Sequence, residues 1–139
     1  MIMMIMMRVL MFVCVAPVKS VELTDELGDD VSAKSVIQST DQSPTVLRCL
    51  VVGGFPPPTI TVALDRRDVT VNFRFRSRAN VTGSRGLRLI EYRSERWTTD
   101  WRPTRADNGQ RVRCVASVPG LASSSTDARL NILCKSYGI

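Results

Sequence analysis

The chain has 139 residues, a formal net charge of +6 and no histidine, and its length fits one domain. Without histidine, neither a Ser-His-Asp or Cys-His catalytic arrangement nor a histidine-ligated metal site can form. The composition therefore argues against an enzyme, and we expect no metal and no cofactor.

The first 20 residues differ from the rest, because they hold all six methionines and a continuous apolar run at 9–18. This run follows Arg8 and is shorter than the ~20 residues that span a membrane. Val18 and Ser20 are small or apolar residues at the positions that signal peptidase reads. We therefore expect residues 1–20 to be a signal peptide cleaved after Ser20; the alternative is an uncleaved N-terminal anchor. No later run predicts a transmembrane span.

After the leader, residues 21–30 are acidic without a clear period and predict an exposed N-terminal segment. Apolar residues in the following segments mostly alternate, which predicts strands at 31–37, 45–51, 60–64, 69–75, 87–89, 97–101, 112–116 and 126–132. Turns or loops separate several of them, notably at 53–58, 77–86, 105–109 and 119–122. Short strands without a convincing helix predict an all-β, two-sheet antiparallel sandwich over 31–133. Residues 134–139 remain as a C-terminal tail or the start of a missing linker.

Removal of the leader would leave three cysteines: Cys49, Cys114 and Cys134. In a secreted chain, paired cysteines form disulfides. Cys49 and Cys114 each lie in the middle of a β-patterned run, where a bridge buried between two sheets would lie, so we predict that they pair. Cys134 follows the last run and is predicted to be unpaired, either free for an intermolecular bond or belonging with a following domain. Three cysteines without a CxxC pair do not predict a zinc site.

Three segments suggest a family. Cys49 is followed by GGFPPP (53–58) and a strand, DNGQRVRC (107–114) leads into Cys114, and STDARLNI (125–132) closes the pattern. Over 31–133 the chain resembles an immunoglobulin-superfamily domain of the intermediate or C2-like set. The resemblance implies an immunoglobulin-like sandwich that serves recognition rather than catalysis.

The sequence departs from this family at two positions. Val62 stands where the family has its core tryptophan, and Val112 stands where a tyrosine usually precedes the second cysteine. Trp97 and Trp101 are the candidates to fill the space beside the disulfide.

Arginine is concentrated between residues 66 and 113, where thirteen arginines face five acidic residues, whereas residues 21–45 carry one lysine and six acids. This asymmetry suggests an acidic partner such as heparan sulfate. The candidate binding residues are Arg74, Arg76, Arg78, Arg85 and Arg88. The alternative is a solvated strand face, because the first three alternate with Phe73 and Phe75. We expect no nucleic-acid partner, since no aromatic stacking set is visible.

Asn80 begins an N-x-S/T sequon (NVT) within the predicted polar loop. In a secreted chain it predicts glycosylation, with a chance match as the alternative. Together these features predict a non-enzymatic recognition module, secreted or on the extracellular face of the plasma membrane. It would bind another protein, with a second copy of itself as one candidate, in adhesion or immune-type recognition. The alternative is an acidic-glycan module that uses the arginine-rich stretch 66–113.

Overall fold

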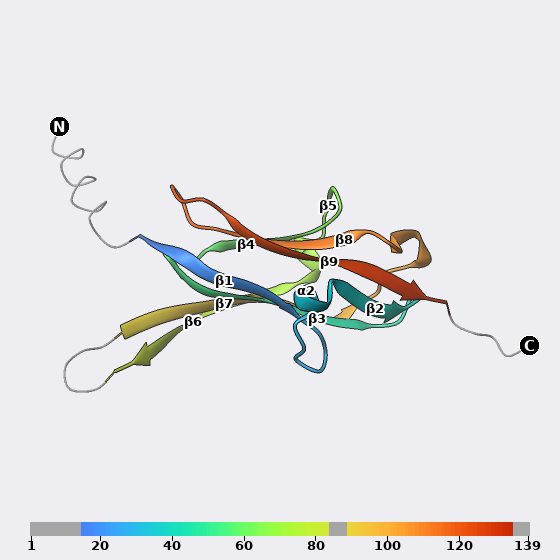
Figure 1. Ribbon diagram of the computed structural model, residues 1–139, viewed down its shortest axis with the longest axis horizontal. Helices are drawn as coiled ribbons and strands as arrows, with labels where there is room; N and C mark the ends of the chain where they lie inside the picture. Colours follow the sequence, from blue (N-terminus) through green and yellow to red (C-terminus); the bar gives the residue numbers. More distant parts are fainter. Residues whose placement is uncertain (1–14, 84–88, 135–139) are drawn as a thin grey trace, which may run out of the picture.

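Two β-sheets pack face to face in the computed structural model, which describes residues 15–83 and 89–134 (Figure 1). The four-stranded sheet has the order β1 (Ala16–Thr24), β3 (Thr45–Phe55), β7 (Leu89–Trp101) and β6 (Arg74–Thr82). The five-stranded sheet has the order β2 (Val36–Thr40), β9 (Ser124–Leu133), β8 (Arg111–Ser117), β4 (Thr59–Leu64) and β5 (Arg67–Asp68). Three short helical segments connect strands: α2 (Val31–Lys34), η1 (Thr70–Asn72) and η2 (Arg105–Asp107). The predicted all-β sandwich is confirmed.

All strand pairs are antiparallel except β2 with β9, which run parallel. The N-terminal part of the chain therefore contributes to both sheets: β1 pairs with β3, and β2 crosses to pair with β9. The sequence-predicted strand at 31–37 is accordingly replaced by helix α2 and the start of β2.

The core lies between the sheets, where alternate residues of β3 and β8 point inward. Leu47, Cys49 and Val51 of β3 are fully buried, and so are Val112 and Cys114 of β8. The disulfide joins Cys49 to Cys114 across the two sheets, with their Cα atoms 6.4 Å apart. Because it closes a loop with a sequence separation of 65, it stabilises the fold by about 4 kcal/mol in the chain-entropy model.

The two tryptophans have separate locations. Trp101 is 8% exposed and its ring centroid lies 5.9 Å from that of Phe73. Trp97 is only partly buried and lies beneath the guanidinium of Arg76. Val62 and Val112, at the positions where the resemblance implies aromatic residues, are both completely buried. Trp101 is therefore the tryptophan that enters the core.

The start of the domain lies further upstream than the sequence predicts. Strand β1 spans Ala16–Thr24, and Leu23 is completely buried opposite Cys49. This corrects the expectation that all of 21–30 is exposed: Val21 and Leu23 supply apolar side chains to the core, so the acidic residues around them do not keep the segment in solvent. Residues 1–14 lie outside the described part of the chain, and cleavage after Ser20 stays a prediction.

The segment 77–86, predicted as a loop, is partly strand. Strand β6 continues to Thr82 and pairs with β7 up to Leu89. The polar residues that suggest a loop are accommodated because β6 is the edge strand of its sheet, where charged and polar side chains are common. Residues 84–88 lie outside the described part of the chain.

Candidate functional site: an arginine-bearing sheet face

The strand register gathers arginines on the outer side of the four-stranded sheet. Successive side chains of a strand point to opposite faces. Cys49 is buried and lies opposite Arg96, so this pair faces inward. The next pair, Arg48 and Trp97, therefore faces outward. In β6, Arg74 and Arg76 lie opposite the outward-facing Trp97 and Glu95. Five arginines share this surface, which we call the arginine face: Arg48, Arg74, Arg76, Arg78 and Arg93.

A single carboxylate serves two of these arginines. Glu95 forms an ion pair with Arg76, whose Nε donates to it, and Arg48 Nε lies 3.5 Å from its second oxygen. The Glu95 side chain is only 10% exposed. The Arg76 guanidinium also lies 5.0 Å from the centroid of the Trp97 ring, a cation–π distance. These contacts fix the position of Arg76 on the face.

Arg78 and Arg93 lie directly opposite each other on β6 and β7. Like charges in this cross-strand position repel. A carboxylate oxygen of Glu91 lies 3.9 Å from Arg93 Nε, but its other oxygen accepts a hydrogen bond from Lys19 Nζ at 2.8 Å. This hydrogen bond, followed by the charge of Lys19, lowers the pKa of Glu91. Glu91 is therefore shared between Lys19 and Arg93, while Arg78 has no ion pair within the described residues.

The face is hollowed at the point where these side chains meet. The hollow has a volume of about 190 Å³. Its lining residues are Arg48, Leu50, Arg76, Arg78, Arg93 and Glu95. A recess with four guanidinium groups and one carboxylate carries a net positive charge and suits an anionic group.

The structure brings together some of the predicted arginines and adds others. Arg74, Arg76 and Arg78 lie on the one face, whereas Arg85 and Arg88 lie outside the described residues. Sequence reasoning did not select Arg48 or Arg93 for this site. The alternation of TVLRCLV places Arg48 on the outward side, but only the pairing of β3 and β6 with β7 shows that Arg48 and Arg93 share the surface.

Asn80 and Cys134 are both exposed. Asn80 belongs to β6, not to a loop, and lies opposite Glu91, on the same face as Arg78. Its glycosylation stays a prediction. Cys134 carries a free thiol just after the end of β9.

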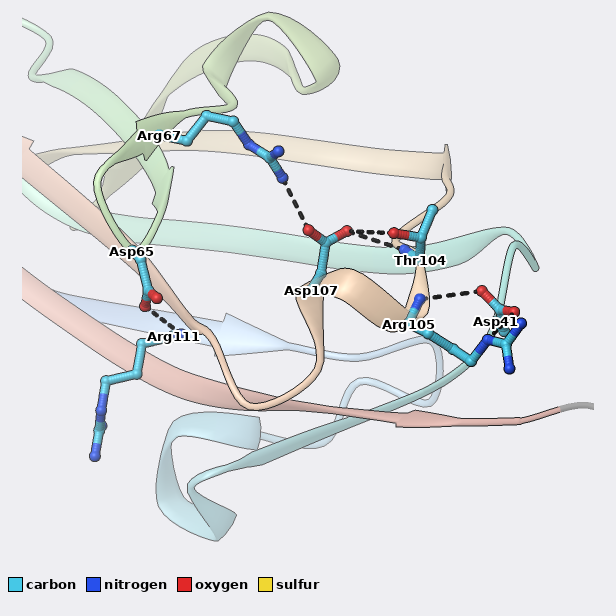
Figure 2. Close-up of polar contacts among 7 residues, drawn as sticks. All are labelled: Asp41, Asp65, Arg67, Thr104, Arg105, Asp107 and Arg111. Carbon is cyan, nitrogen blue, oxygen red and sulfur yellow. Dashed lines mark hydrogen bonds and ion pairs between the residues drawn. The ribbon is translucent and has the colours of Figure 1, made fainter.

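A second polar region lies at the turn before β8, and we call it the turn cluster (Figure 2). Asp107 accepts hydrogen bonds from the backbone N–H of Thr104 at 2.9 Å and from the Arg67 guanidinium at 3.1 Å. Asp41 accepts one from the backbone N–H of Arg105 at 3.1 Å, and its other oxygen lies 3.2 Å from Arg105 Nε. The cluster spans Asp41, Asp65, Arg67, Thr104, Arg105, Asp107 and Arg111.

The turn cluster has a structural role. Asp107 caps η2 through a reciprocal capping box with Thr104, and Asp65 accepts from the backbone N–H of Arg111 at 2.8 Å. Gly109 has a φ of 83°, in the left-handed region that favours glycine, and it lies in the turn that the sequence predicts at 105–109. In the described residues no His, Cys, Asp or Glu side chains form a group of three able to hold a metal ion. Nor does that part of the chain include a helix with the length and apolar character that crossing a membrane requires.

The fold and the inter-sheet disulfide together define an immunoglobulin domain. The chain belongs to the family of CD80-like C2-set immunoglobulin domains, whose model matches residues 30–125, more than half of the chain. This confirms the C2-like resemblance of the sequence.

Comparison with curated proteins finds no significant match. Among solved structures, the D1-D2 fragment of Rst has 20% identity and a TM-score of 0.53 over 84% of this chain and 49% of that one. The Ig1–Ig3 ectodomain of mouse nectin-like molecule 4 has 18% identity and a TM-score of 0.50, over 86% of this chain and 33% of that one. The chain thus spans about half and a third of these two structures, which share its fold.

Proposed function

We propose that the chain is a non-enzymatic extracellular recognition module that binds another protein through surface contacts. The observation that carries this proposal is the C2-set sandwich closed by the Cys49–Cys114 disulfide. Such a disulfide persists in oxidising, extracellular compartments. The domain would serve in cell adhesion or in immune-type recognition.

A multivalent form of the chain, incubated with intact cells, tests the proposal. We expect binding that withstands enzymatic removal of heparan sulfate and is lost when surface proteins are digested. Loss after heparan sulfate removal alone would instead support a glycan ligand, and no binding to any of a broad panel of cell types would contradict the proposal. Aggregation of beads that carry only this chain would identify a second copy as the partner.

The second candidate function is binding of an acidic glycan such as heparan sulfate. A specific observation favours it: Arg74, Arg76 and Arg78, which the sequence suggests as binding residues, project from one exposed sheet face. The planar guanidinium of arginine presents its N–H donors in a geometry that fits the oxygens of sulfate and carboxylate groups. Salt elution from immobilised heparin tests this candidate. Elution of the wild-type chain at low salt, unchanged when all three arginines are replaced by alanine, would contradict it.

A further inference from the structure

We propose that the arginine face binds a sulfated glycan chain and that one sulfate group lies between Arg78 and Arg93. This inference rests on the second candidate function and assigns it a site across strands β3, β7 and β6. The site differs from the row of arginines along β6 that the sequence suggests, because Arg48 and Arg93 contribute from neighbouring strands.

The repulsion between Arg78 and Arg93 favours an anion at this position. The antiparallel register holds these two cations directly opposite each other, and Glu91 is the only acidic residue paired with either one within the described chain. An anion placed between them would be attracted by both guanidinium groups and would screen their repulsion. Two guanidinium groups also supply enough N–H donors to bond several oxygens of one sulfate.

The position of Glu95 favours anion binding at Arg78 and Arg93. Its carboxylate already pairs with Arg48 and Arg76, so these two arginines are partly neutralised before a ligand arrives. Arg78 and Arg93 line the same hollow but lie beyond this pair of contacts. Glu95 therefore partly neutralises the side of the face that holds Arg48 and Arg76 and opposes anion binding there. On the side of Arg78 and Arg93, the one paired carboxylate within the described residues is Glu91, shared with Lys19.

The regular spacing of the arginines along β6 favours a polymeric ligand. Arg74, Arg76 and Arg78 recur at every second residue of β6, so their side chains follow one another at about 7 Å. Arg48 and Arg93 extend the positive surface across two further strands. A linear polymer with regularly spaced sulfates can contact several of these groups at once, whereas a single small anion contacts one pair.

The experiment measures heparin affinity of the chain in variants that all carry Asn80→Gln, because a glycan on Asn80 would lie on the same face. The test variant adds Arg78→Ala and Arg93→Ala. Its matched control adds Arg66→Ala and Arg129→Ala, which remove the same charge from the other sheet. Arg66 is exposed in the turn between β4 and β5, and Arg129 is exposed on β9. We expect the test variant to bind heparin at least about tenfold more weakly. The control should change by less than about twofold, because distant surface charges are screened.

A gain of affinity provides the second measurement. Glu95→Gln removes the carboxylate charge that neutralises Arg48 and Arg76 and keeps the size of the side chain. We expect heparin to bind about two- to fivefold more tightly, an effect of the size of one weak ion pair. A misfolded variant would lose affinity, so a gain cannot come from unfolding.

The outcomes separate the site from the function. If the chain that carries Asn80→Gln alone does not bind heparin, the second candidate function fails together with this inference. If it binds but the test and control variants weaken equally, or Glu95→Gln does not tighten binding, the function stands and the site is wrong. If poly-glutamate binds as tightly as heparin and with the same dependence on Arg78 and Arg93, the ligand is a carboxylate-bearing chain and the assignment to sulfate is overturned.

Discussion

The arginine face and the turn cluster are both rich in arginine, but they differ in how the charges are balanced. In the turn cluster Arg67 and Arg105 each have a carboxylate of their own, Asp107 and Asp41. On the arginine face Arg48 and Arg76 share Glu95, and Arg78 lies opposite another arginine.

A count of arginines is therefore a poor guide to the binding of anions. An arginine that already holds a carboxylate, as Arg67 does, has most of its attraction for anions satisfied within the protein. An arginine with a cation beside it, as Arg78 has, raises the local positive potential. The following variants test the distinction, in order of expected effect.

Removal of the disulfide should disrupt both regions at once. With Cys49→Ala and Cys114→Ala together, we expect the free energy of unfolding to fall by about 4 kcal/mol, since the unfolded chain is no longer constrained. Urea unfolding measures this loss. Non-reducing peptide mapping of the wild type should find Cys49 joined to Cys114, and a Cys49–Cys134 peptide would contradict the bridge.

Loss of the Asp107 carboxylate should weaken the turn cluster alone. Asp107→Ala leaves Arg67 and the Thr104 N–H without their acceptor, and we expect about 2 kcal/mol of destabilisation. Asp100→Ala, at an exposed position, serves as the control. Thermal unfolding and heparin elution are measured together; a changed heparin affinity in folded Asp107→Ala would remove the distinction between the two regions.

Replacement of Arg96 would remove a positive charge from the inward side of β7, the strand that carries Arg93 on its outward side. Arg96 faces inward, and its Nε donates to the Ile60 carbonyl of the opposite sheet at 3.2 Å. Arg96 also donates to the Phe73 carbonyl at 3.4 Å, so we expect Arg96→Met to cost about 1–2 kcal/mol of stability through loss of these bonds. Heparin affinity should stay close to that of the wild type, although the net charge falls as much as in Arg93→Ala. Equal losses of affinity in the two variants would show that net charge, not the face, governs binding.

The smallest effect concerns protonation of Glu91. Its pKa is lowered in the folded protein, mainly by the hydrogen bond from Lys19 and then by the charge of Lys19. The stability contributed by this contact is therefore fully present above the ordinary pKa of glutamate and is lost as the pH falls through the lowered value. In a chain that retains residues 15–20, Lys19→Met should bring the pKa of Glu91 back toward its ordinary value in an NMR titration.

Asp68 is the internal control for that titration. Its pKa is lowered by hydrogen bonds from the Thr70 side chain and backbone, and Lys19 does not contribute. The Asp68 titration should therefore be the same with and without Lys19. A parallel shift of both carboxyl groups would point to a general change in the protein and not to the Lys19 contact.

The fold could be predicted because its signals are local. Alternation around Cys49 and Cys114 marks two strands of a core, and the glycine at position 109 marks a turn, whichever strands pair. The end of β6 could not be predicted, because RANVT has polar and small residues typical of a loop and becomes a strand only through pairing with β7. The burial of Leu23 could not be predicted for a similar reason, because Val21 and Leu23 alternate over too short a stretch among acidic residues to predict a strand.

The site could be predicted only in part. The period-two arginines of β6 are visible in the sequence, but the opposition of Arg78 and Arg93 depends on the register between two strands. The contact of Arg48 with Glu95 depends on a third strand, far away in the sequence. Such cross-strand relationships leave no periodic signal in one chain, so charge composition alone does not select Arg48.

The parallel pairing of β2 with β9 has a mechanical consequence. The start of β1 and the end of β9 lie at opposite ends of the molecule (Figure 1), and β2 and β9 point in the same direction. Once β1 has separated from β3, a force applied at these ends pulls β9 one way and β2 the other, along their common axis. The hydrogen bonds between them run across that axis and share the load. The ladder must then yield as a whole, which makes this junction resist tension better than a hairpin that opens one bond at a time.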